Sequence, residues 1–373
     1  MKKYIAKTFQ GLEFVLEQEL RELGITETTQ LTRSVAFECG FEDMMRANLT
    51  LRTALRIYQP FHEFEFRNEK QMYDELVKLD WSEFLTADKT FAIENVVLTE
   101  SVRNSHFISL KTKDAIVDFF YQTENRRPNV DVRWPDVRIQ IYISKANKCV
   151  LSVDTTGEPL YKRGYKKRQT EASMNECLAA GLVLMTGWKG EKDMYDMMTG
   201  SGTITAEALM YASNYPVNIH REKWPFFDFE EFKLKDFKKL QQELKDKIVI
   251  PDCDFYVNDK NKEAMDIAKM NIFDLKVNTS RVQFSRDDFF EMTPTSEGVM
   301  ILNPPYDERL AVKEVELWYK DLGDMMKRNY KNFDVWVISS NKNAMRKIGL
   351  KDSQRFPLVN GALNCEFCKY EIY

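Results

Sequence analysis

The chain has 373 residues, of which 43% are hydrophobic and 30% are charged. This balance is typical of a globular protein with two or three domains and enough apolar residues for buried cores. No apolar run approaches the roughly 20 residues that a membrane-spanning helix requires. The two lysines after the first methionine are not followed by the apolar stretch of a signal peptide. We therefore expect no association with a membrane.

Six cysteines occur at irregular spacings, which favours reduced thiols and a cytoplasmic protein. Cys365 and Cys368 have the spacing of half a metal site, but no second pair accompanies them, and the chain has only three histidines. We therefore predict no metal site and place these two thiols on a C-terminal strand.

The net charge of −4 does not indicate a nucleic-acid-binding protein, but the distribution of charge is uneven. Residues 1–60 hold eight basic and eight acidic side chains, whereas residues 101–150 hold nine basic and five acidic ones. Between positions 159 and 170 there are five basic residues and no acidic one. Because local patches bind a polyanion, the two basic regions are its candidate contacts.

The first 155 residues predict two small α+β units. In the first unit, strand, helix, strand and helix are expected around residues 4–6, 12–20, 34–39 and 44–51. Gly24 is a plausible stop for the first helix. In the second unit, helices are expected at 72–79 and 111–121, and strands at 90–95, 138–143 and 149–154.

From about residue 172 strands alternate with helices, which predicts a doubly wound parallel sheet. The expected strands are 194–198, 255–259, 299–303 and 334–339, and the expected helices are 203–213, 261–272 and 312–329. An insertion at roughly 214–251 interrupts this alternation after the first helix. Near the end, Asn360-Gly361 between extended segments predicts a terminal hairpin.

The first strand and helix of this region are joined by Asp-Met-Met-Thr-Gly-Ser-Gly-Thr at 196–203. Gly200 and Gly202 let the backbone turn sharply and approach a ligand closely. A dinucleotide-binding loop needs a third glycine where Thr205 stands, and a P-loop needs a Gly-Lys pair that is absent. A nucleotide-type crevice and an ordinary strand–helix turn both remain open from this loop alone.

Acidic residues follow the second strand and a further strand that ends at about Ser285. Asp259 ends the second strand, where a carboxylate can accept both hydroxyls of a ribose or cap the helix that starts at Asn261. Asp288, beside Asp287 and Phe289, can pair with an adenine amino group while the ring packs on the base. A solvated turn is the alternative for this second position.

The motif Asn-Pro-Pro-Tyr at 303–306 follows the apolar strand end directly. The side-chain oxygen of Asn303 and the carbonyl of Pro304 can accept both hydrogens of an aromatic amine and aim its lone pair at an electrophilic methyl group. Successive prolines fix these acceptors, and Tyr306 can stack on the base. Asp307 or water can take the proton. An ordinary Asn-Pro turn is the alternative.

These motifs resemble those of the THUMP-domain class I RNA methyltransferases, especially the bacterial 23S rRNA guanine-N2 methyltransferases. The resemblance covers nearly the whole chain. Its motifs are 196–203, 303–306, Tyr-Lys-Arg-Gly-Tyr at 161–165, Ala172–Leu178, Lys-Trp-Pro-Phe at 223–226, Asn360-Gly361, and the THUMP-like segments 105–106 and 113–117. One departure is Met197-Met198-Thr199, where relatives place proline and cysteine.

The resemblance implies an α/β fold, in which a Rossmann-like class I methyltransferase domain with a terminal antiparallel hairpin follows an α+β ferredoxin-like and THUMP region. The implied domains are a ferredoxin-like unit at 1–60, a THUMP RNA-binding domain at 61–155, a basic linker at 156–171 and the methyltransferase domain at 172–373. The expected substrate is 23S rRNA or a ribosome assembly intermediate.

The resemblance also implies S-adenosylmethionine as cofactor. Asp196 and Gly200 are then expected near its amino acid portion, Asp259 at the ribose and Asp288 at the adenine. Ser201, Gly202 and Asn303 complete the expected cofactor site.

The basic linker is predicted to hold RNA phosphates while the catalytic domain receives one flipped base. The residues expected to bind RNA are Lys162, Arg163, Lys166, Lys167 and Arg168, with Tyr161 and Tyr165 interleaved for stacking. A solvated linker is the alternative.

Three other functions stay open. Asn-Pro-Pro-Tyr suits the N6 amine of adenine as well as the N2 amine of guanine. A non-catalytic RNA-binding or ribosome assembly factor is a second alternative, which the intact Asn303 and Asp259 disfavour. A Rossmann dehydrogenase is weakened by the missing third glycine.

Overall fold

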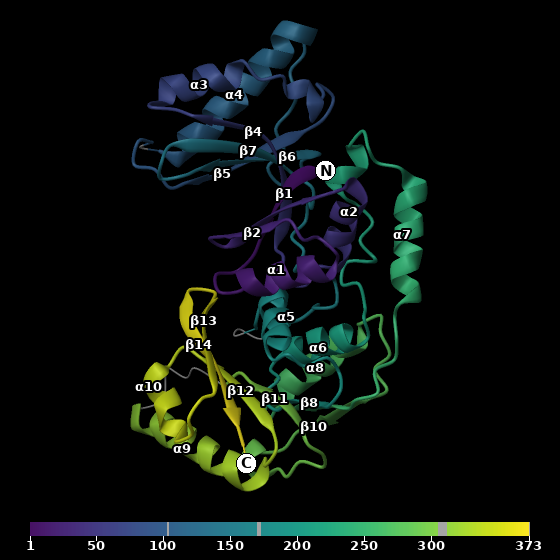
Figure 1. Ribbon diagram of the computed structural model, residues 1–373, viewed down its shortest axis with the longest axis vertical. Helices are drawn as coiled ribbons and strands as arrows, with labels where there is room; N and C mark the ends of the chain where they lie inside the picture. Colours follow the sequence, from purple (N-terminus) through teal and green to yellow (C-terminus); the bar gives the residue numbers. More distant parts are fainter. Residues whose placement is uncertain (103, 170–172, 305–311, 373) are drawn as a thin grey trace.

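A computed structural model describes residues 1–102, 104–169, 173–304 and 312–372 of the chain. The molecule is elongated, with three parts along its length (Figure 1). The second α+β unit lies at one end, the first α+β unit lies in the middle, and the parallel-sheet domain forms the other end.

The two N-terminal units share one seven-stranded sheet, in the order β2-β3-β1-β4-β7-β6-β5. Its strands are β1 (Lys2–Lys7), β2 (Thr28–Leu31), β3 (Ser34–Cys39), β4 (Arg56–Glu65), β5 (Phe91–Val97), β6 (Val137–Ile143) and β7 (Lys148–Asp154). Neighbouring strands are antiparallel except β5 and β6, which run parallel.

Strand β4 joins the two units. Its first residues pair with β1, and the rest of the strand pairs with β7, with a register shift between Pro60 and His62. The boundary expected at residue 60 therefore falls at a bulge within a continuous strand. The sequence did not predict β4 because it contains a proline, nor β2 because it is a short, mostly exposed edge strand.

Helices cover this sheet. They are α1 (Glu13–Glu22), α2 (Phe41–Thr50), α3 (Glu69–Val77) and α4 (Ser105–Glu124), with a 3₁₀ turn η1 (Trp81–Glu83). The expected stop of α1 at Gly24 is confirmed, since Gly24 adopts φ 85°, a backbone conformation that residues with a side chain rarely adopt. Helix α4 is capped at its start by Asn104, whose side chain accepts the His106 N–H, and at its end by Asn125 in the left-handed region.

The C-terminal sheet also has seven strands, in the order β10-β9-β8-β11-β12-β14-β13. They are β8 (Asp193–Asp196), β9 (Phe255–Asn258), β10 (Val282–Ser285), β11 (Gly298–Leu302), β12 (Asp334–Ser339), β13 (Gln354–Asn360) and β14 (Leu363–Glu371). The first five are parallel, whereas β14 is antiparallel to both β12 and β13. This confirms the predicted parallel sheet with a terminal hairpin.

Six helices accompany this sheet within the described part of the chain. They are α5 (Glu176–Met185), α6 (Thr203–Ala212), α7 (Leu234–Asp246), α8 (Lys262–Phe273), α9 (Val312–Asn329) and α10 (Lys342–Met345), with 3₁₀ turns η2 (Pro225–Asp228), η3 (Phe289–Glu291) and η4 (Arg346–Ile348). The insertion carries η2 and α7 and returns to the N-terminal units, where Glu243 pairs with Arg46 at 2.9 Å and Glu231 pairs with Lys2.

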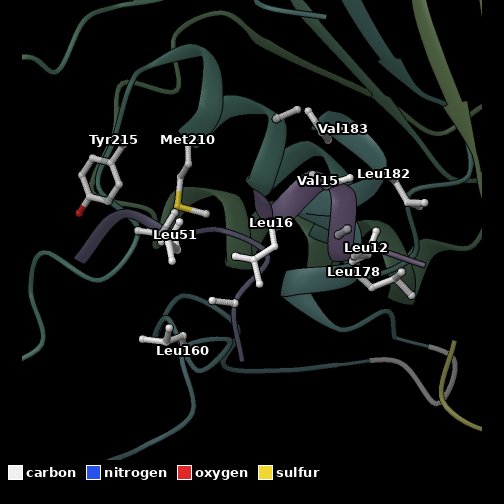
Figure 2. Close-up of a cluster of buried hydrophobic side chains, with 14 of the residues drawn as sticks. Leu12, Val15, Leu16, Leu51, Leu160, Leu178, Leu182, Val183, Met210 and Tyr215 are labelled. Carbon is white, nitrogen blue, oxygen red and sulfur yellow. The ribbon is translucent and has the colours of Figure 1, made fainter. Parts of the chain in front are cut away.

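One apolar core joins the first α+β unit to the parallel-sheet domain. Leu12 and Leu16 of α1 lie beside Leu178 and Leu182 of α5 (Figure 2). A side chain at Gly181 would place its Cβ 2.7 Å from the Leu12 methyl carbons, so the two helices are in close contact. The second unit has a core of its own, built on β5, β6, β7 and α4.

The cysteine prediction is confirmed in part, because Cys365 and Cys368 are both buried in β14. Across residues 1–102, 104–169, 173–304 and 312–372, no helix is long and apolar enough to cross a membrane. Within the same ranges, no three His, Cys, Asp or Glu side chains gather where a metal ion could bind.

Candidate functional site

The predicted site residues follow strands that end at the same edge of the C-terminal sheet. Met300 of β11 is level with Tyr195 of β8, and Asp196 is level with Val257 of β9. Asp196 therefore ends one strand beside the loops that carry Asp259 and Asn303. The order of strands reverses between β8 and β11, which is where open α/β sheets bind their ligands.

The glycine loop has the backbone conformation that its sequence predicted. Gly200 and Gly202 adopt φ values of 54° and 78°. A Cβ at Gly202 would lie 3.1 Å from the Ala268 Cα in α8, so a larger residue would be both strained and crowded there. Helix α6 therefore starts close against α8.

Asp196 is buried, and only one of its two carboxylate oxygens accepts hydrogen bonds from the described residues. One carboxylate oxygen accepts hydrogen bonds from the Thr199 hydroxyl (2.7 Å) and from the Thr205 hydroxyl (2.8 Å) and amide (3.2 Å). The other oxygen is buried and has no hydrogen-bond partner among the described residues. Burial raises the pKa of this carboxyl to about 6, against the opposing hydrogen bonds. A cationic donor such as the ammonium of an amino acid fits this unsatisfied oxygen.

Asp259 connects the second strand to the glycine loop. Its two oxygens accept the Gly200 N–H and the Asn261 N–H, both at 2.9 Å. The cap of α8 is Asn261 itself, which accepts the amides of Glu263 and Ala264. Because a carboxylate has about four acceptor positions, Asp259 keeps capacity for two ribose hydroxyls.

Asn258, which the sequence analysis missed, holds three loops of this edge together. Its amide donates to the carbonyls of Met197 (3.2 Å) and Asp287 (3.1 Å), and its oxygen accepts from Ser285 and from the Asp287 N–H at 2.9 Å each. A polar residue at the end of an otherwise apolar strand was the sequence signal.

Asp287 and Asp288 are both exposed. Asp288 caps the 3₁₀ turn η3 by accepting the Phe290 N–H at 3.0 Å. The backbone of Asp287 is instead fixed by Asn258. Both carboxylates are candidates for the adenine amino group. The family resemblance predicts that Asp288 is the one that binds it.

The predicted catalytic motif begins immediately after β11, whose five residues are all buried. Asn303 is half-buried and Pro304 is buried. Tyr306 and Asp307 lie outside the described residues. The motif therefore starts where the sequence placed it, one strand away from Asp196.

The basic linker differs from its prediction, because three of its expected RNA contacts are held inside the protein. The side chain of Arg163 is 1% exposed and pairs with Glu207 of α6, whose side chain is 0% exposed. Tyr165 is buried and donates its hydroxyl to the same carboxylate at 2.8 Å. Lys166 is almost buried and donates to the Met174 carbonyl. These three side chains cannot reach a phosphate or a base, and we correct their assignment.

Glu207 is the centre of this buried network. Burial raises the pKa of its carboxyl to about 7, while the guanidinium groups of Arg163 and Arg52 oppose that shift. Arg163 also donates to the Arg52 carbonyl, and Arg52 donates to the carbonyls of Met210 (3.2 Å) and Tyr215 (2.8 Å). The linker is thereby fixed to both the first unit and α6. A single charged residue in an otherwise apolar helix was the signal for Glu207.

The other basic linker residues remain exposed. Lys162 and Lys167 form surface ion pairs with Glu158 (3.1 Å) and Asp274 (2.8 Å), and Arg168 is exposed. Exposed pairs of this kind are weak, so both lysines stay available to a polyanion.

Asn271, buried on α8, connects this linker to the glycine loop. Its amide donates to the carbonyls of Arg168 (3.0 Å) and Ser201 (2.9 Å). The Ser201 hydroxyl lies 2.6 Å from that of Ser173. The end of the linker is thus tied to the loop predicted to hold the cofactor, and a polar residue on the buried face of α8 was the sequence signal.

A seven-stranded sheet of this order, with a glycine loop after its first strand and Asn-Pro after its fourth, defines a class I methyltransferase with S-adenosylmethionine as cofactor. Residues 163–369 match the family described as RMKL-like, methyltransferase domain, and the chain belongs to this family. Residues 66–154 match the THUMP domain and residues 3–58 the RlmL ferredoxin-like domain. The resemblance seen in the sequence is confirmed.

Relatives of known name agree with this family. The chain is 32% identical over 376 residues to a Synechocystis protein provisionally named an RNA methyltransferase, and covers 97% of it. It is 33% identical to the ribosomal RNA large subunit methyltransferase K/L of Aliivibrio salmonicida, of which it spans only 54%. The crystal structure of SMU.472, a provisionally assigned methyltransferase complexed with SAH, shares 26% identity with a TM-score of 0.90, covering 100% of this chain and 98% of that chain.

The raised pKa of Asp196 predicts a pH-dependent cofactor affinity. A carboxyl with a pKa of about 6 is protonated below that pH and then attracts an ammonium group less strongly. We expect the affinity for S-adenosylmethionine to rise up to tenfold per unit between about pH 5 and pH 6 and to level off above. Isothermal titration calorimetry at several pH values measures this.

The control is Asp196→Asn, which keeps the shape of the side chain but removes its charge. This variant should bind more weakly and lose the pH dependence. An unchanged pH profile in the variant would assign the titration to another group.

Proposed function

We propose that this protein transfers a methyl group from S-adenosylmethionine to the exocyclic N2 of a guanine in 23S rRNA. The observation that carries the proposal is the position of Asn303-Pro304 after β11, beside the strand that ends at Asp196. An amine held there would face a methyl donor bound on the glycine loop.

The chemistry of this position suits an aromatic amine, whose lone pair is delocalised into the ring. When bound, S-adenosylmethionine supplies an electrophilic methyl group on a sulfonium. The Asn303 side-chain oxygen and the Pro304 carbonyl are acceptors for the two amino hydrogens, which favours a lone pair directed away from the ring. Preorganised acceptors and close positioning supply much of such an acceleration.

Three observations support RNA as the substrate. The chain has a THUMP domain, and relatives that match over the whole chain carry names of RNA or ribosomal RNA methyltransferases. Lys162, Lys167 and Arg168 are exposed on the linker next to the catalytic domain. A base must leave its stack to reach a site at the edge of the sheet.

The choice of guanine N2 rests on the family resemblance. Methylation of adenine N6 in RNA is the second candidate, because Asn303 and Pro304 offer the same two acceptors to either amine.

The first test identifies the product. Unmodified total RNA is incubated with the protein and labelled S-adenosylmethionine, digested to nucleosides and separated. We expect label in N2-methylguanosine, in the large-subunit RNA. Label in N6-methyladenosine would replace the first candidate with the second, and cofactor binding without any transfer would contradict catalysis on RNA.

Asn303→Ala tests the mechanism in the same assay. Loss of one preorganised acceptor should lower the transfer rate by roughly a hundredfold or more. Because Asn303 is also expected to border the cofactor, calorimetry should show a loss of cofactor affinity that is much smaller than the loss of rate. Asn278→Ala, in an exposed turn, is the matched control and should keep full activity. Normal turnover in Asn303→Ala would refute the proposed role.

The linker is tested separately, by changing Lys162, Lys167 and Arg168 together to alanine. Each phosphate contact contributes a slope of roughly 0.7–0.9 to the dependence of log affinity on log salt. The triple variant should therefore bind RNA more weakly at low salt and show a slope smaller by up to about 2–3. Filter binding over a range of salt concentrations measures both.

The matched control replaces three exposed lysines of the insertion helix α7, Lys235, Lys238 and Lys239. It should bind as the unchanged protein does. Equal losses in the two triple variants would indicate a general charge effect and remove the linker from the RNA site.

A further inference from the structure

The loop between α4 and β6 carries an unusual pair of exposed apolar side chains. Val132 is 75% exposed and Trp134 is 69% exposed, more than any other large apolar side chain of the described residues except Met1. Val130, in the same loop, is 48% exposed. Exposed apolar side chains that gather in one loop can mark an interaction site.

Trp134 is exposed although hydrogen bonds hold the backbone of its loop in place. One oxygen of Asp131 accepts the N–H groups of both Arg133 and Trp134 at 2.9 Å. The Asp131 N–H donates to the Phe91 carbonyl at 3.0 Å, so the turn is attached to the first residue of β5. Pro135 then restricts the backbone of Trp134. The backbone that carries Trp134 is therefore already ordered before a ligand binds, which lowers the entropy cost of binding.

The charge of the region that carries Trp134 favours an anionic partner, because residues 101–150 hold nine basic and five acidic side chains. Arg133 is exposed beside it, and Arg127 of the same loop is exposed with its guanidinium 4.7 Å from the Tyr121 ring. Two carboxylates lie in the same loop, where Asp131 caps the turn and Asp136 accepts the amide and hydroxyl of Thr90 at 2.8 Å each. Exposed arginines next to an exposed aromatic ring are the combination that binds unpaired nucleic acid.

The loop also lies on the side of the THUMP domain that meets the catalytic chain. Asp136 lines a cleft together with Pro225 and Phe229 of the insertion. Lys89, from the same end of the sheet, pairs with Asp228 of the insertion at 3.4 Å. Trp134 is two residues from Asp136, so it lies close to the junction between the THUMP domain and the insertion.

We propose that Trp134 is a stacking site for an unpaired base of the RNA substrate, with Arg133 at the adjoining phosphate. The proposal rests on the proposed function for the identity of the ligand as RNA. It adds a contact that is separate from the basic linker and from the catalytic motif. Because every base has an aromatic face, the site selects unpaired RNA over duplex rather than a particular sequence.

The test compares two RNA probes with each protein variant. One probe is a fluorescein-labelled hairpin with a single-stranded extension, and the other is the same hairpin with a blunt end. Trp134→Ala should weaken binding of the extended probe by roughly five- to a hundredfold, the range found for one stacked base. Binding of the blunt probe should be unchanged, and Trp134→Phe should retain most of the affinity.

Leu98→Ala is the matched control, because Leu98 is a 45% exposed apolar residue after the other end of β5. It should bind both probes normally. In methylation assays Trp134→Ala should raise the KM for RNA and leave kcat unchanged. If the unchanged protein methylates no RNA, the proposed function fails, whatever the binding data show.

Two results would overturn the proposal. The first is a Trp134→Ala variant that binds the extended probe as tightly as the unchanged protein, or that loses affinity equally for both probes. The second is normal binding of both probes together with loss of association with ribosomal subunits, which would assign the loop to a protein partner.

Discussion

The buried ion pair between Arg163 and Glu207 is the constraint on which the arrangement of the catalytic domain depends. Two charges removed from water cost several kcal/mol each, and they are tolerated only when their geometry and remaining hydrogen bonds are satisfied. Tyr165 and the Arg52 carbonyl supply two of those bonds, whereas the Arg163 Nε is buried without a hydrogen-bond partner among the described residues. The pair therefore fixes the linker against α6, the helix that begins at the glycine loop, and holds the first α+β unit in the same network through Arg52.

This network gives the linker two kinds of positive charge. Arg163 and Lys166 face inward and position structure, whereas Lys162, Lys167 and Arg168 face outward and can meet RNA. Asn271 carries the connection onward, since one amide holds the carbonyls of Arg168 and Ser201. RNA bound on the outer residues would thus be connected to the loop proposed to hold the methyl donor through a single residue, Asn271, which hydrogen-bonds to both the linker and that loop. The apolar core shared by α1 and α5 also holds the first α+β unit against the catalytic domain (Figure 2).

Periodicity predicted most elements of the fold, because their helices and strands bury apolar residues at regular spacing. It failed for β4 and β2, where a proline and an exposed polar edge remove that pattern. The ends of β8, β9 and β11 were predicted with their acidic and Asn-Pro motifs, since parallel strands place their carboxyl ends together. The inward orientation of the Arg163 side chain was not predicted. A run of basic residues gives no indication of which side chains have a buried carboxylate opposite them. Glu207 is 44 positions away in sequence, and only the folded chain brings it there.

The central claim is that Arg163 and Glu207 act as one buried pair that positions α6, the helix that begins at the glycine loop. A double-mutant cycle of Arg163→Met, Glu207→Gln and the double variant tests it most directly, with the free energy of unfolding measured in urea. Each single change should cost about 3–5 kcal/mol because it leaves a buried group without its partner. The double variant should cost clearly less than the sum, with a coupling of up to about 3 kcal/mol. Additive losses, or single variants as stable as the unchanged protein, would contradict the account.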